Sequence, residues 1–363
     1  WIMAYTDIDK PSDYFNTVLY TGNGGTNSVT SLDFQPNFVW IKNRSHAGYN
    51  HALFDSVRSA TKVLKSNLTD IERTLTDSLT AFNSNGFSLG ADADNTYGNT
   101  VNQNAKTYAS WNWRTGTSFT NDASATGIGT LDSTGSVNTD AGFSIVSWTA
   151  GSGVSGIAHG LGGVPDLIIS KDRDAASGWI VGSHLINNWD SYLNLTNTST
   201  LTSDVRMYHP SGQARPSSTI FFQDHAAIGS SGEKMIAYCF RSIKGYSKFS
   251  SYIGNGQDTP NGVFTYLGFT PAFILIKATD INSWVMVDNK RPADSNPVDD
   301  SLAADSTAAE TTGNADTTFD FLSNGFRTNG NSGNNNSSGQ EYIFMAFASS
   351  PFTTSTGIPA TAK

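Results

Sequence analysis

Aromatic side chains within polar segments are the residues of this chain that could most directly contact a ligand. Surfaces that bind sugars are often built from aromatic planes beside Asn, Asp and Ser side chains, and the sequence is rich in both kinds of residue. Loops lie on the surface of a fold, so aromatic residues within polar loops are expected to be exposed. We therefore predict Tyr49, Tyr97, Trp189 and Tyr208 as candidate glycan contacts.

Carboxylates are the second group with chemical potential, because a glycan-cleaving enzyme needs two of them roughly 5 to 9.5 Å apart. Asp55 and Asp288 occupy matching positions, and an arginine, Arg58 or Arg291, follows each of them three residues later. A position that recurs in structural copies is typical of a turn or a salt bridge, since a single active site needs only one copy. We therefore predict no catalytic residue.

Lysines and histidines offer little for a metal or a cofactor. Lys42, Lys171 and Lys277 each end an apolar run, and we expect their ammonium groups to reach water. The six histidines are scattered without a repeated spacing, and zinc sites need three or four converging ligands. We predict no metal site and no cofactor. The single cysteine, Cys239, lies within an apolar segment and is expected to be a small buried hydrophobic residue.

The elements that must position these residues recur three times along the chain. Each segment has an opening glycine turn, a proline followed by an apolar run, and a closing apolar segment. A unit of about 95 residues is large enough for its own β-sandwich, whereas repeats of about 20 to 50 residues must stack. We therefore predict three separate domains. Their closing segments are 108–113, 235–240 and 342–347.

The composition predicts an all-β fold made of three tandem β-sandwich-like repeat domains with short or no helices. Gly, Ser, Thr and Asn separate runs of aromatic and β-branched residues, which is the pattern of short strands joined by turns. Asn-Gly between aromatic residues predicts hairpins at 82–87 and 321–326. Leucine, isoleucine and valine residues between 55 and 79 recur every three or four positions, which predicts one or two short helices there.

The domain boundaries follow from the repeats and from changes in composition. Residues 16–116, 141–245 and 246–352 are predicted to be the three repeats. Residues 117–140 are polar and rich in Gly, Ser and Thr, so we expect a linker, and residues 353–363 are expected to form a flexible tail. Residues 1–15 resemble a closing segment and its link, which predicts the last strand of a preceding domain.

The charge of the chain argues against a nucleic-acid partner, and its hydropathy argues against a membrane span. The net charge of −9 is spread without basic clusters, whereas nucleic-acid binding needs concentrated Lys and Arg. We therefore expect no nucleic-acid partner. The sequence has no run of 18 apolar residues, so we also expect no membrane span.

Several long phrases of the sequence resemble the repeat module of tailed-bacteriophage virion proteins. The likeness extends from about residue 5 to residue 352. Modules of this kind are common in marine phages and often lie beside lectin-like domains in tail-fibre or receptor-binding chains. The phrases that carry the likeness are residues 10–24, 31–44, 142–148 and 245–256.

The resemblance implies a virion structural protein, assembled in the bacterial cytoplasm and used outside the cell. It implies a tail-fibre or receptor-binding component, with other virion proteins and host cell-surface polysaccharide as partners. It also implies a homotrimer, in which weak glycan contacts are multiplied by avidity. A purely structural virion protein, such as a capsid decoration or tail spacer, is the main alternative, and a polysaccharide depolymerase is a further one. The module brings no functional residues that can be transferred to this sequence.

Overall fold

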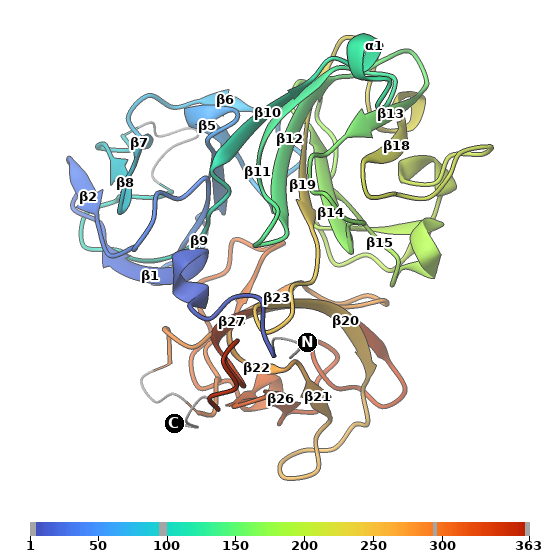
Figure 1. Cartoon of the computed structure of the whole chain (residues 1–363). Coiled ribbons are helices and arrows are strands. Elements are labelled where there is room, and N and C mark those ends of the chain that lie inside the picture. Colours follow the sequence, from blue (N-terminus) through green and yellow to red (C-terminus); the bar gives the residue numbers. More distant parts are fainter. Residues whose placement is uncertain (1–4, 94–99, 293–295, 360–363) are drawn as a thin grey trace.

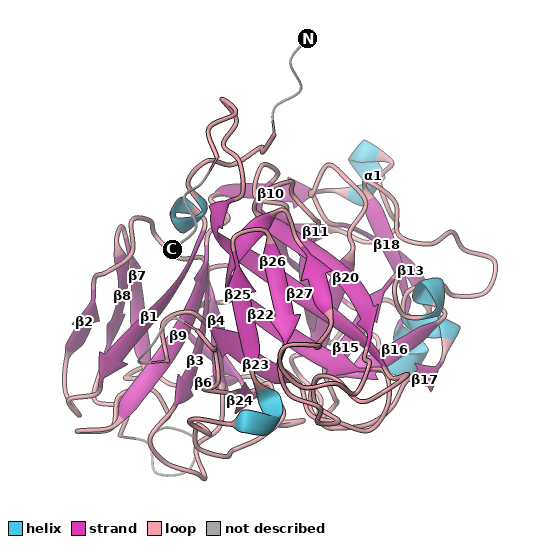
Figure 2. Ribbon diagram, turned by 90° about the horizontal axis from the view of Figure 1, so that it is seen from below, coloured by secondary structure: helices cyan, strands magenta, loops and turns pink. Residues whose placement is uncertain are grey.

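The chain folds almost entirely into β-strands. The computed structural model describes residues 5–93, 100–292 and 296–359, and within these ranges the helices are short turns beside the sheets (Figures 1 and 2). The prediction of an all-β fold is therefore confirmed. None of the helices in the described ranges is long and apolar enough to cross a membrane.

Figure 1 shows three lobes around a common centre. We call them lobe 1 (residues 11–113), lobe 2 (residues 117–240) and lobe 3 (residues 247–351). Each lobe contains one large antiparallel sheet and one small sheet of two or three strands.

Lobe 1 has the large sheet β1-β9-β3-β4-β5-β6 and the small sheet β2-β8-β7. Its elements are η1 (Pro11–Asp13), β1 (Phe15–Thr21), β2 (Asn27–Val29), β3 (Phe38–Asn43), β4 (Ala52–Asp55), β5 (Ser59–Leu64), β6 (Arg73–Thr74), β7 (Leu79–Asn83), β8 (Gly86–Leu89) and β9 (Thr107–Trp113).

Lobe 2 has the large sheet β10-β11-β12-β19-β14-β15-β16-β17 and the small sheet β13-β18. Its elements are β10 (Thr117–Asn121), α1 (Ala123–Thr126), β11 (Ser133–Asn138), β12 (Phe143–Thr149), β13 (Val154–Ala158), β14 (Leu167–Asp172), β15 (Ile180–Ser183), η2 (Asn187–Trp189), β16 (Ser191–Asn194), β17 (Thr202–Ser203), η3 (Val205–Met207), β18 (Ile220–Asp224), α2 (His225–Ile228) and β19 (Lys234–Phe240).

Lobe 3 has the large sheet β20-β27-β22-β23-β24 and the small sheet β21-β26-β25. Its elements are β20 (Ser247–Ile253), β21 (Phe264–Tyr266), β22 (Phe269–Ala278), β23 (Val285–Asp288), β24 (Leu302–Ala303), η4 (Ala315–Thr317), β25 (Phe319–Leu322), β26 (Gly325–Thr328) and β27 (Glu341–Pro351).

The large sheets share an order of five strands. In each, the closing strand (β9, β19 or β27) lies between the opening strand (β1, β12 or β20) and the strand after the proline (β3, β14 or β22), and two more strands follow. The register is shared as well, because the closing aromatic residue pairs with the matching residue of each neighbour: Trp113 with Phe15 and Phe38, Phe240 with Phe143 and Leu167, Phe347 with Ser247 and Phe273.

The closing strands divide their side chains between two cores, because successive side chains of a strand point to opposite faces. In lobe 1, Trp111 and Trp113 enter a core shared by all three lobes, whereas Tyr108 enters a core of lobe 1 alone. Cys239 is buried in the separate core of lobe 2, as predicted, and this burial raises its thiol pKa to about 12. The other closing-strand residues of the shared core are Ala109, Ile236, Tyr238, Phe240, Ile343, Met345 and Phe347.

Aromatic rings join the lobes across this shared core. Phe38 of lobe 1 stacks on Tyr238 of lobe 2 with ring centroids 4.3 Å apart, and Phe15 stacks on Phe347 of lobe 3 at 5.1 Å. The prediction of three separate domains is therefore wrong. Each lobe is a sandwich of its own two sheets, but the inner face of its large sheet is apolar and is buried by the other two lobes.

The predicted linker and the predicted helices are also corrected. Residues 117–140 form β10, α1 and β11, and β11 pairs along its length with β12, so this polar segment extends the large sheet of lobe 2. Residues 59–64 and 73–74 are the paired strands β5 and β6 instead of helix. The Asn-Gly hairpins are present as β7–β8 and β25–β26.

The two ends of the described chain lie against each other. In the predicted flexible tail, Thr353 forms a bridge with Pro359, and Ser355 donates its backbone N–H to Asp9 at 2.6 Å. Residues 1–4, which carry most of the predicted extra strand, and residues 360–363 lie outside the described ranges.

Candidate functional site

The three predicted glycan contacts that the structure describes, Tyr49, Trp189 and Tyr208, do not form an exposed site. Trp189 is 2% exposed and Tyr208 is 0% exposed, so the prediction that they lie on the surface is wrong. Their loops are polar, but η2 and η3 turn both rings into the core of lobe 2, where they contact each other. Tyr49 is half-buried and donates its hydroxyl hydrogen to Gln103 at 2.5 Å, and Tyr97 lies outside the described residues.

The three matching lysines are buried, which corrects the expectation that they reach water. Each ammonium group donates to the carbonyl of the next residue, Asn43, Asp172 or Ala278, at 2.9, 2.5 and 2.6 Å. Burial lowers the pKa of each lysine to about 8. They hold the turn that follows β3, β14 or β22, which is a structural role.

Asp55 belongs to a buried ion pair where lobes 1 and 2 meet, which we call interface 1–2. Its carboxylate lies beside the Arg58 guanidinium and accepts a hydrogen bond of 2.8 Å from the Tyr238 hydroxyl of lobe 2. Glu72 continues the network, because it accepts from Arg58 at 3.3 Å and from two nitrogens of Arg173 in lobe 2 at 2.8 and 2.9 Å.

Asp288 forms the matching network where lobes 3 and 1 meet, which we call interface 3–1. It pairs with Arg291 at 2.6 Å and accepts a 3.0 Å hydrogen bond from the Trp111 indole of lobe 1. Glu310 bridges Arg291 and Arg44 of lobe 1 at 3.0 and 2.7 Å. The interpretation of both aspartates as salt-bridge residues is confirmed.

Interface 2–3, where lobes 2 and 3 meet, keeps the backbone contact and lacks these charges. The matching backbone hydrogen bonds run from Glu72 N to Arg173 O (2.8 Å), from Glu310 N to Arg44 O (2.9 Å) and from Leu201 N to Thr279 O (3.1 Å). Leu201 thus stands in the place of the glutamates, and Ser183 in the place of the aspartates.

A ring nitrogen also crosses each interface at one matching position. His51, Trp179 and Trp284 immediately precede β4, β15 and β23, and their ring nitrogens bind Ala303 O, Lys65 O and Asn194 O, each at 2.9 Å. His51 accepts the Trp40 indole hydrogen at Nδ1, so Nε2 must carry the hydrogen donated to Ala303. Burial keeps the pKa of His51 well below its usual value. The recurring polar residues therefore make contacts between neighbouring lobes, and these contacts close a ring of three lobes.

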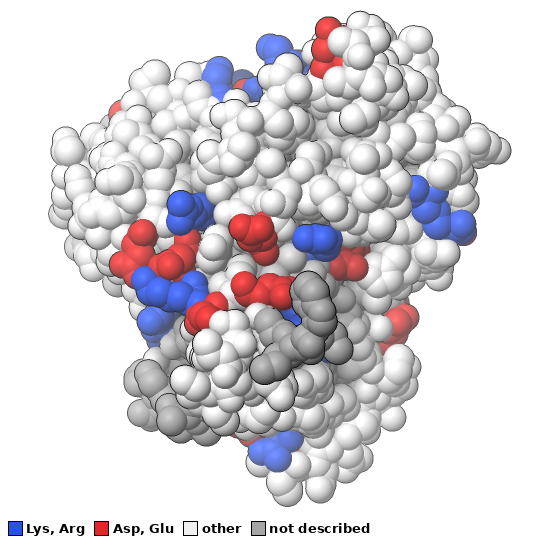
Figure 3. Space-filling model, viewed as in Figure 1, with Lys and Arg blue, Asp and Glu red and all other residues white. Residues whose placement is uncertain are grey.

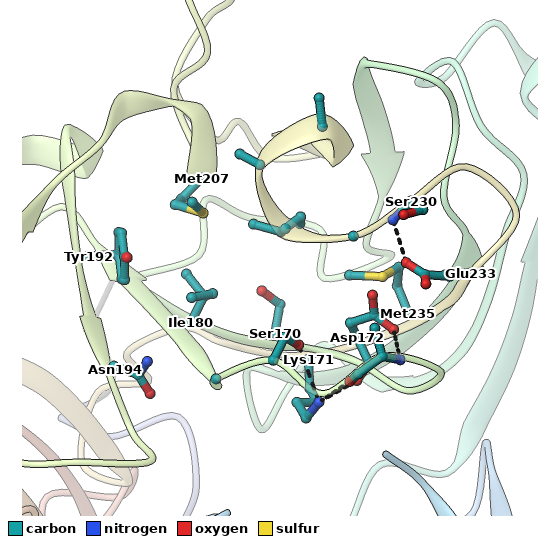
Figure 4. Close-up of a pocket in the computed structure, with 17 residues that line it drawn as sticks. Ser170, Lys171, Asp172, Ile180, Tyr192, Asn194, Met207, Ser230, Glu233 and Met235 are labelled. Carbon is teal, nitrogen blue, oxygen red and sulfur yellow. Dashed lines mark hydrogen bonds between the residues drawn. The ribbon is translucent and has the colours of Figure 1, made fainter. Parts of the chain in front are cut away.

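A pocket of about 420 Å³ in lobe 2 brings together polar and apolar residues that could serve a ligand (Figure 4). It opens between β14, β15 and β16 on one side and α2 with the turn after it on the other. Ile180, Met207 and Met235 give it an apolar wall, and Tyr192 and Asn194 stand at one end. Asp172 and Glu233 stand at the opposite end.

Asp172 and Glu233 converge on one point of this pocket. A Cβ at Gly229 would lie 2.6 Å from Asp172 Oδ2 and 3.1 Å from Glu233 Oε2. Asp172 Oδ1 accepts from the backbone of Asp174 at 2.8 Å and Ala175 at 2.9 Å, whereas the buried Oδ2 has no donor from the described chain. Burial, together with the neighbouring Glu233 carboxylate, raises the pKa of Asp172.

Lobes 1 and 3 cannot form this pocket. Where lobe 2 has Met235, they have Tyr108 and Tyr342, whose hydroxyls bind the backbone of the segments preceding their closing strands. Lobe 2 replaces those segments with α2 and a tight turn, which leaves space above Met235. In addition, the positions of Asp172 and Glu233 are occupied by Asn43 and Lys106 in lobe 1 and by Ala278 and Gln340 in lobe 3.

Sequence reasoning missed Asp172 and Glu233 because it searched for positions that recur. The signal that could have found them was a residue type present in one repeat and missing from the other two. Asp172 follows the matching lysine, Glu233 is one of four glutamates, and an acidic residue occurs at each of these positions in the second repeat alone. In the part of the chain that the structure describes, no group of three or more His, Cys, Asp or Glu side chains could hold a metal ion.

The fold and the pocket thus define an all-β protein of three lobes with one polar, ligand-sized cavity in its second lobe. Residues 10–351 match a family described as a domain of unknown function (DUF7483), and the chain belongs to this family. The match spans all three lobes as one unit, in agreement with their shared core. No curated protein matches the chain.

Proposed function

We propose that this chain is a virion component of a tailed bacteriophage, of the tail-fibre or receptor-binding type, and that it binds host cell-surface glycan. The pocket of lobe 2 is the observation that carries the binding proposal. Its volume lies within the range usual for small-ligand sites, about 300 to 1,000 Å³. It combines an aromatic ring, an amide and two carboxylates with an apolar wall, groups that suit the hydroxyls and the ring face of a sugar.

The architecture supports a role on a particle that works outside the cell. Three lobes closed into a ring, with buried ion pairs at two interfaces, give a rigid body that has no need of a disulfide. Figure 3 shows a face on which charged side chains are sparse and of mixed sign, which suits a glycan better than a phosphate backbone. In a homotrimer, three such pockets would add avidity to weak single contacts.

The test is binding of the purified chain to susceptible host cells, with competition by their purified surface polysaccharide. We expect wild-type protein to bind and Tyr192→Ala to bind at least about tenfold more weakly, since a stacked ring and its hydroxyl contribute about 1 to 3 kcal/mol. Tyr266→Ala is the matched control, because Tyr266 is 55% exposed on lobe 3, away from the pocket.

Two outcomes would contradict the proposal. If the wild-type chain binds no susceptible host, the chain is instead a virion spacer that contacts only other virion proteins. If Tyr266→Ala abolishes binding and Tyr192→Ala does not, glycan binding belongs to lobe 3 and not to the pocket of lobe 2. Release of oligosaccharides from host envelopes would replace binding with depolymerase activity.

A further inference from the structure

One oxygen at the carboxylate end of the pocket, Asp172 Oδ2, lacks a hydrogen-bond donor among the described residues. Asp172 lines the cavity and is 1% exposed, and this Oδ2 is buried. Glu233 accepts one hydrogen bond, from the backbone N–H of Ser230. A buried carboxylate oxygen is costly unless a donor or a cation reaches it. The pocket is therefore incomplete on the side where the two carboxylates meet.

Lys171 does not complete it, although its side chain lines the same pocket. The ammonium group has three N–H bonds, and its three acceptors are Asp172 O at 2.5 Å, Ala175 O at 3.1 Å and Ser177 Oγ at 3.3 Å. Figure 4 shows this nitrogen turned toward the backbone, away from the two carboxylates. Lys171 therefore gives all three of its donors to these acceptors and none to the two carboxylates.

We propose that the pocket recognises an amino sugar, a hexosamine whose free amine is protonated, with the ammonium group held between Asp172 and Glu233. This inference rests on the proposed glycan-binding function and names the class of sugar. The ammonium supplies donors to Asp172 Oδ2 and Glu233, and the sugar ring packs against the apolar wall of Ile180, Met207 and Met235.

The charges of the pocket decide between classes of sugar. An acidic sugar would add a third negative charge beside two carboxylates, which is unfavourable. A neutral sugar would satisfy the open oxygen but would leave the repulsion between the carboxylates. A cation satisfies the oxygen and removes the repulsion, and charge-assisted hydrogen bonds are roughly twice as strong as neutral ones. The expected order of affinity is amino sugar, then neutral sugar, then acidic sugar.

Titration of the full chain with four monosaccharides near neutral pH, followed by calorimetry or ligand-observed NMR, tests this order. The probes are glucosamine, N-acetylglucosamine, which keeps the ring but loses the charge, glucose and glucuronic acid. We expect glucosamine to bind about tenfold more tightly than N-acetylglucosamine, the effect of one additional charge-assisted hydrogen bond. Glucuronic acid is expected to bind most weakly.

Asp172→Asn is the decisive variant. Its side-chain oxygen can still accept from the Asp174 and Ala175 backbone, while the charge is lost. We expect the preference for glucosamine to fall to about one. Asp174→Asn is the control, because it makes the same change of net charge at an exposed residue outside the pocket and should retain the preference. Glu233→Gln provides a second loss of charge if Asp172→Asn fails to fold.

Gly229→Ala adds a steric test that leaves all charges in place. Gly229 has φ 179°, an extended conformation that alanine also adopts, so the main effect of the new methyl group is to press on the Asp172 and Glu233 carboxylates. We expect this variant to bind all the monosaccharides more weakly, because the methyl group displaces the two carboxylate oxygens that are proposed to hold the ammonium.

The outcomes separate this inference from the proposed function. Equal binding of glucosamine and N-acetylglucosamine, or a preference that persists in Asp172→Asn, overturns the amino-sugar inference. If such a protein still binds host polysaccharide, the proposed function stands. Calcium binding that Asp172→Asn abolishes, without any preference among sugars, would assign the carboxylates to a metal ion and would also overturn the inference. Failure to bind any host polysaccharide overturns both proposals.

Discussion

Interfaces 1–2 and 2–3 close the same ring with different chemistry. At interface 1–2, Asp55 and Arg58 are fully buried and Glu72 links them to Arg173 of the next lobe. At interface 2–3, Ser183 and Leu201 occupy the positions of Asp55 and Glu72, and the hydrogen bonds that cross the interface there join uncharged groups. Both retain the same backbone hydrogen bond and the same ring-nitrogen contact.

The difference shows that the backbone geometry and the aromatic core suffice to join two lobes. A buried ion pair seldom adds net stability over apolar residues of the same volume, but loss of one partner is very costly. We therefore infer that the charges specify which lobe docks on which. A lobe with Arg58 buried beside an apolar partner would carry an uncompensated charge.

Removal of one buried carboxylate should have the largest effect. We expect Asp55→Ala to lower the free energy of unfolding by about 3 to 5 kcal/mol, because Arg58 remains buried without its main partner. Urea denaturation followed by tryptophan fluorescence measures the change. Asp288→Ala should behave alike at interface 3–1. A loss below about 1 kcal/mol in both variants would mean that the pairs are solvated in solution and would remove the contrast with interface 2–3.

Transfer of the glutamate to the apolar interface should destabilise the chain. At interface 2–3, Leu201→Glu would place a carboxylate beside Ile186 and Thr279, which have replaced Arg58 and Arg173. We expect a loss of about 1 to 3 kcal/mol, the usual cost of a poorly paired polar group at a partly buried site. Leu201→Gln serves as the uncharged control and should cost less. A neutral or stabilising Leu201→Glu would show that position 201 is solvated.

Acid should weaken interface 3–1 more than the other two, because His51 stands where they have tryptophan. The pKa of buried His51 is well below its usual value, so the unfolded chain binds a proton at a higher pH than the folded chain does. Stability is therefore lost as the pH falls below about 6.5, by up to about 1.4 kcal/mol per pH unit for one proton.

Urea denaturation at a series of pH values measures this slope, and His51→Gln should reduce it. His159, whose pKa burial lowers to about 4, contributes in the same direction and remains in the variant as an internal reference. The raised pKa of Asp172 acts in the opposite direction. An unchanged slope in His51→Gln would mean that His51 binds its proton equally readily in the folded and the unfolded chain.

The smallest effect is expected at Ser183. Its hydroxyl donates to Asp166 O at 2.6 Å and accepts from the Leu185 N–H at 3.1 Å, and both partners belong to lobe 2. We expect Ser183→Ala to cost about 1 kcal/mol, because two ordinary hydrogen bonds within one lobe are lost. A loss as large as that of Asp55→Ala would show that this position is equally sensitive without a charge, which would remove the contrast between the two interfaces.

Much of the fold could be predicted from the sequence, because individual strands are indicated by short apolar runs and by the turn residues beside them. The apolar runs after the prolines became β3, β14 and β22, and the closing segments became β9, β19 and β27. The shared core could not be predicted, since an apolar run shows that a strand such as β3 is covered on both faces but does not show what covers it. Residues 117–140 were predicted to be a linker because they are polar. They form strands, because strand pairing needs backbone groups and not apolar side chains.

The site was harder to predict from the sequence than the fold. Exposure of Trp189 and Tyr208 was inferred from their polar neighbours, but turns can direct a large ring inward while their other side chains face water. The pocket depends on the short segment between α2 and β19 and on Met235 in the place of a tyrosine. The space exists because no side chain fills it, and a missing side chain leaves no motif in the sequence.

The order of the lobes along the chain has a consequence for synthesis on the ribosome. Lobe 1 is complete at Trp113, but Trp111 receives its partner Asp288 only when lobe 3 emerges. At about 5 to 20 residues per second, the nascent first lobe waits roughly 10 to 50 s with its inner aromatic face uncovered. During this interval the apolar inner face of the nascent lobe is open to contact with other chains, so we expect that a chaperone bound to it would raise the yield of folded protein.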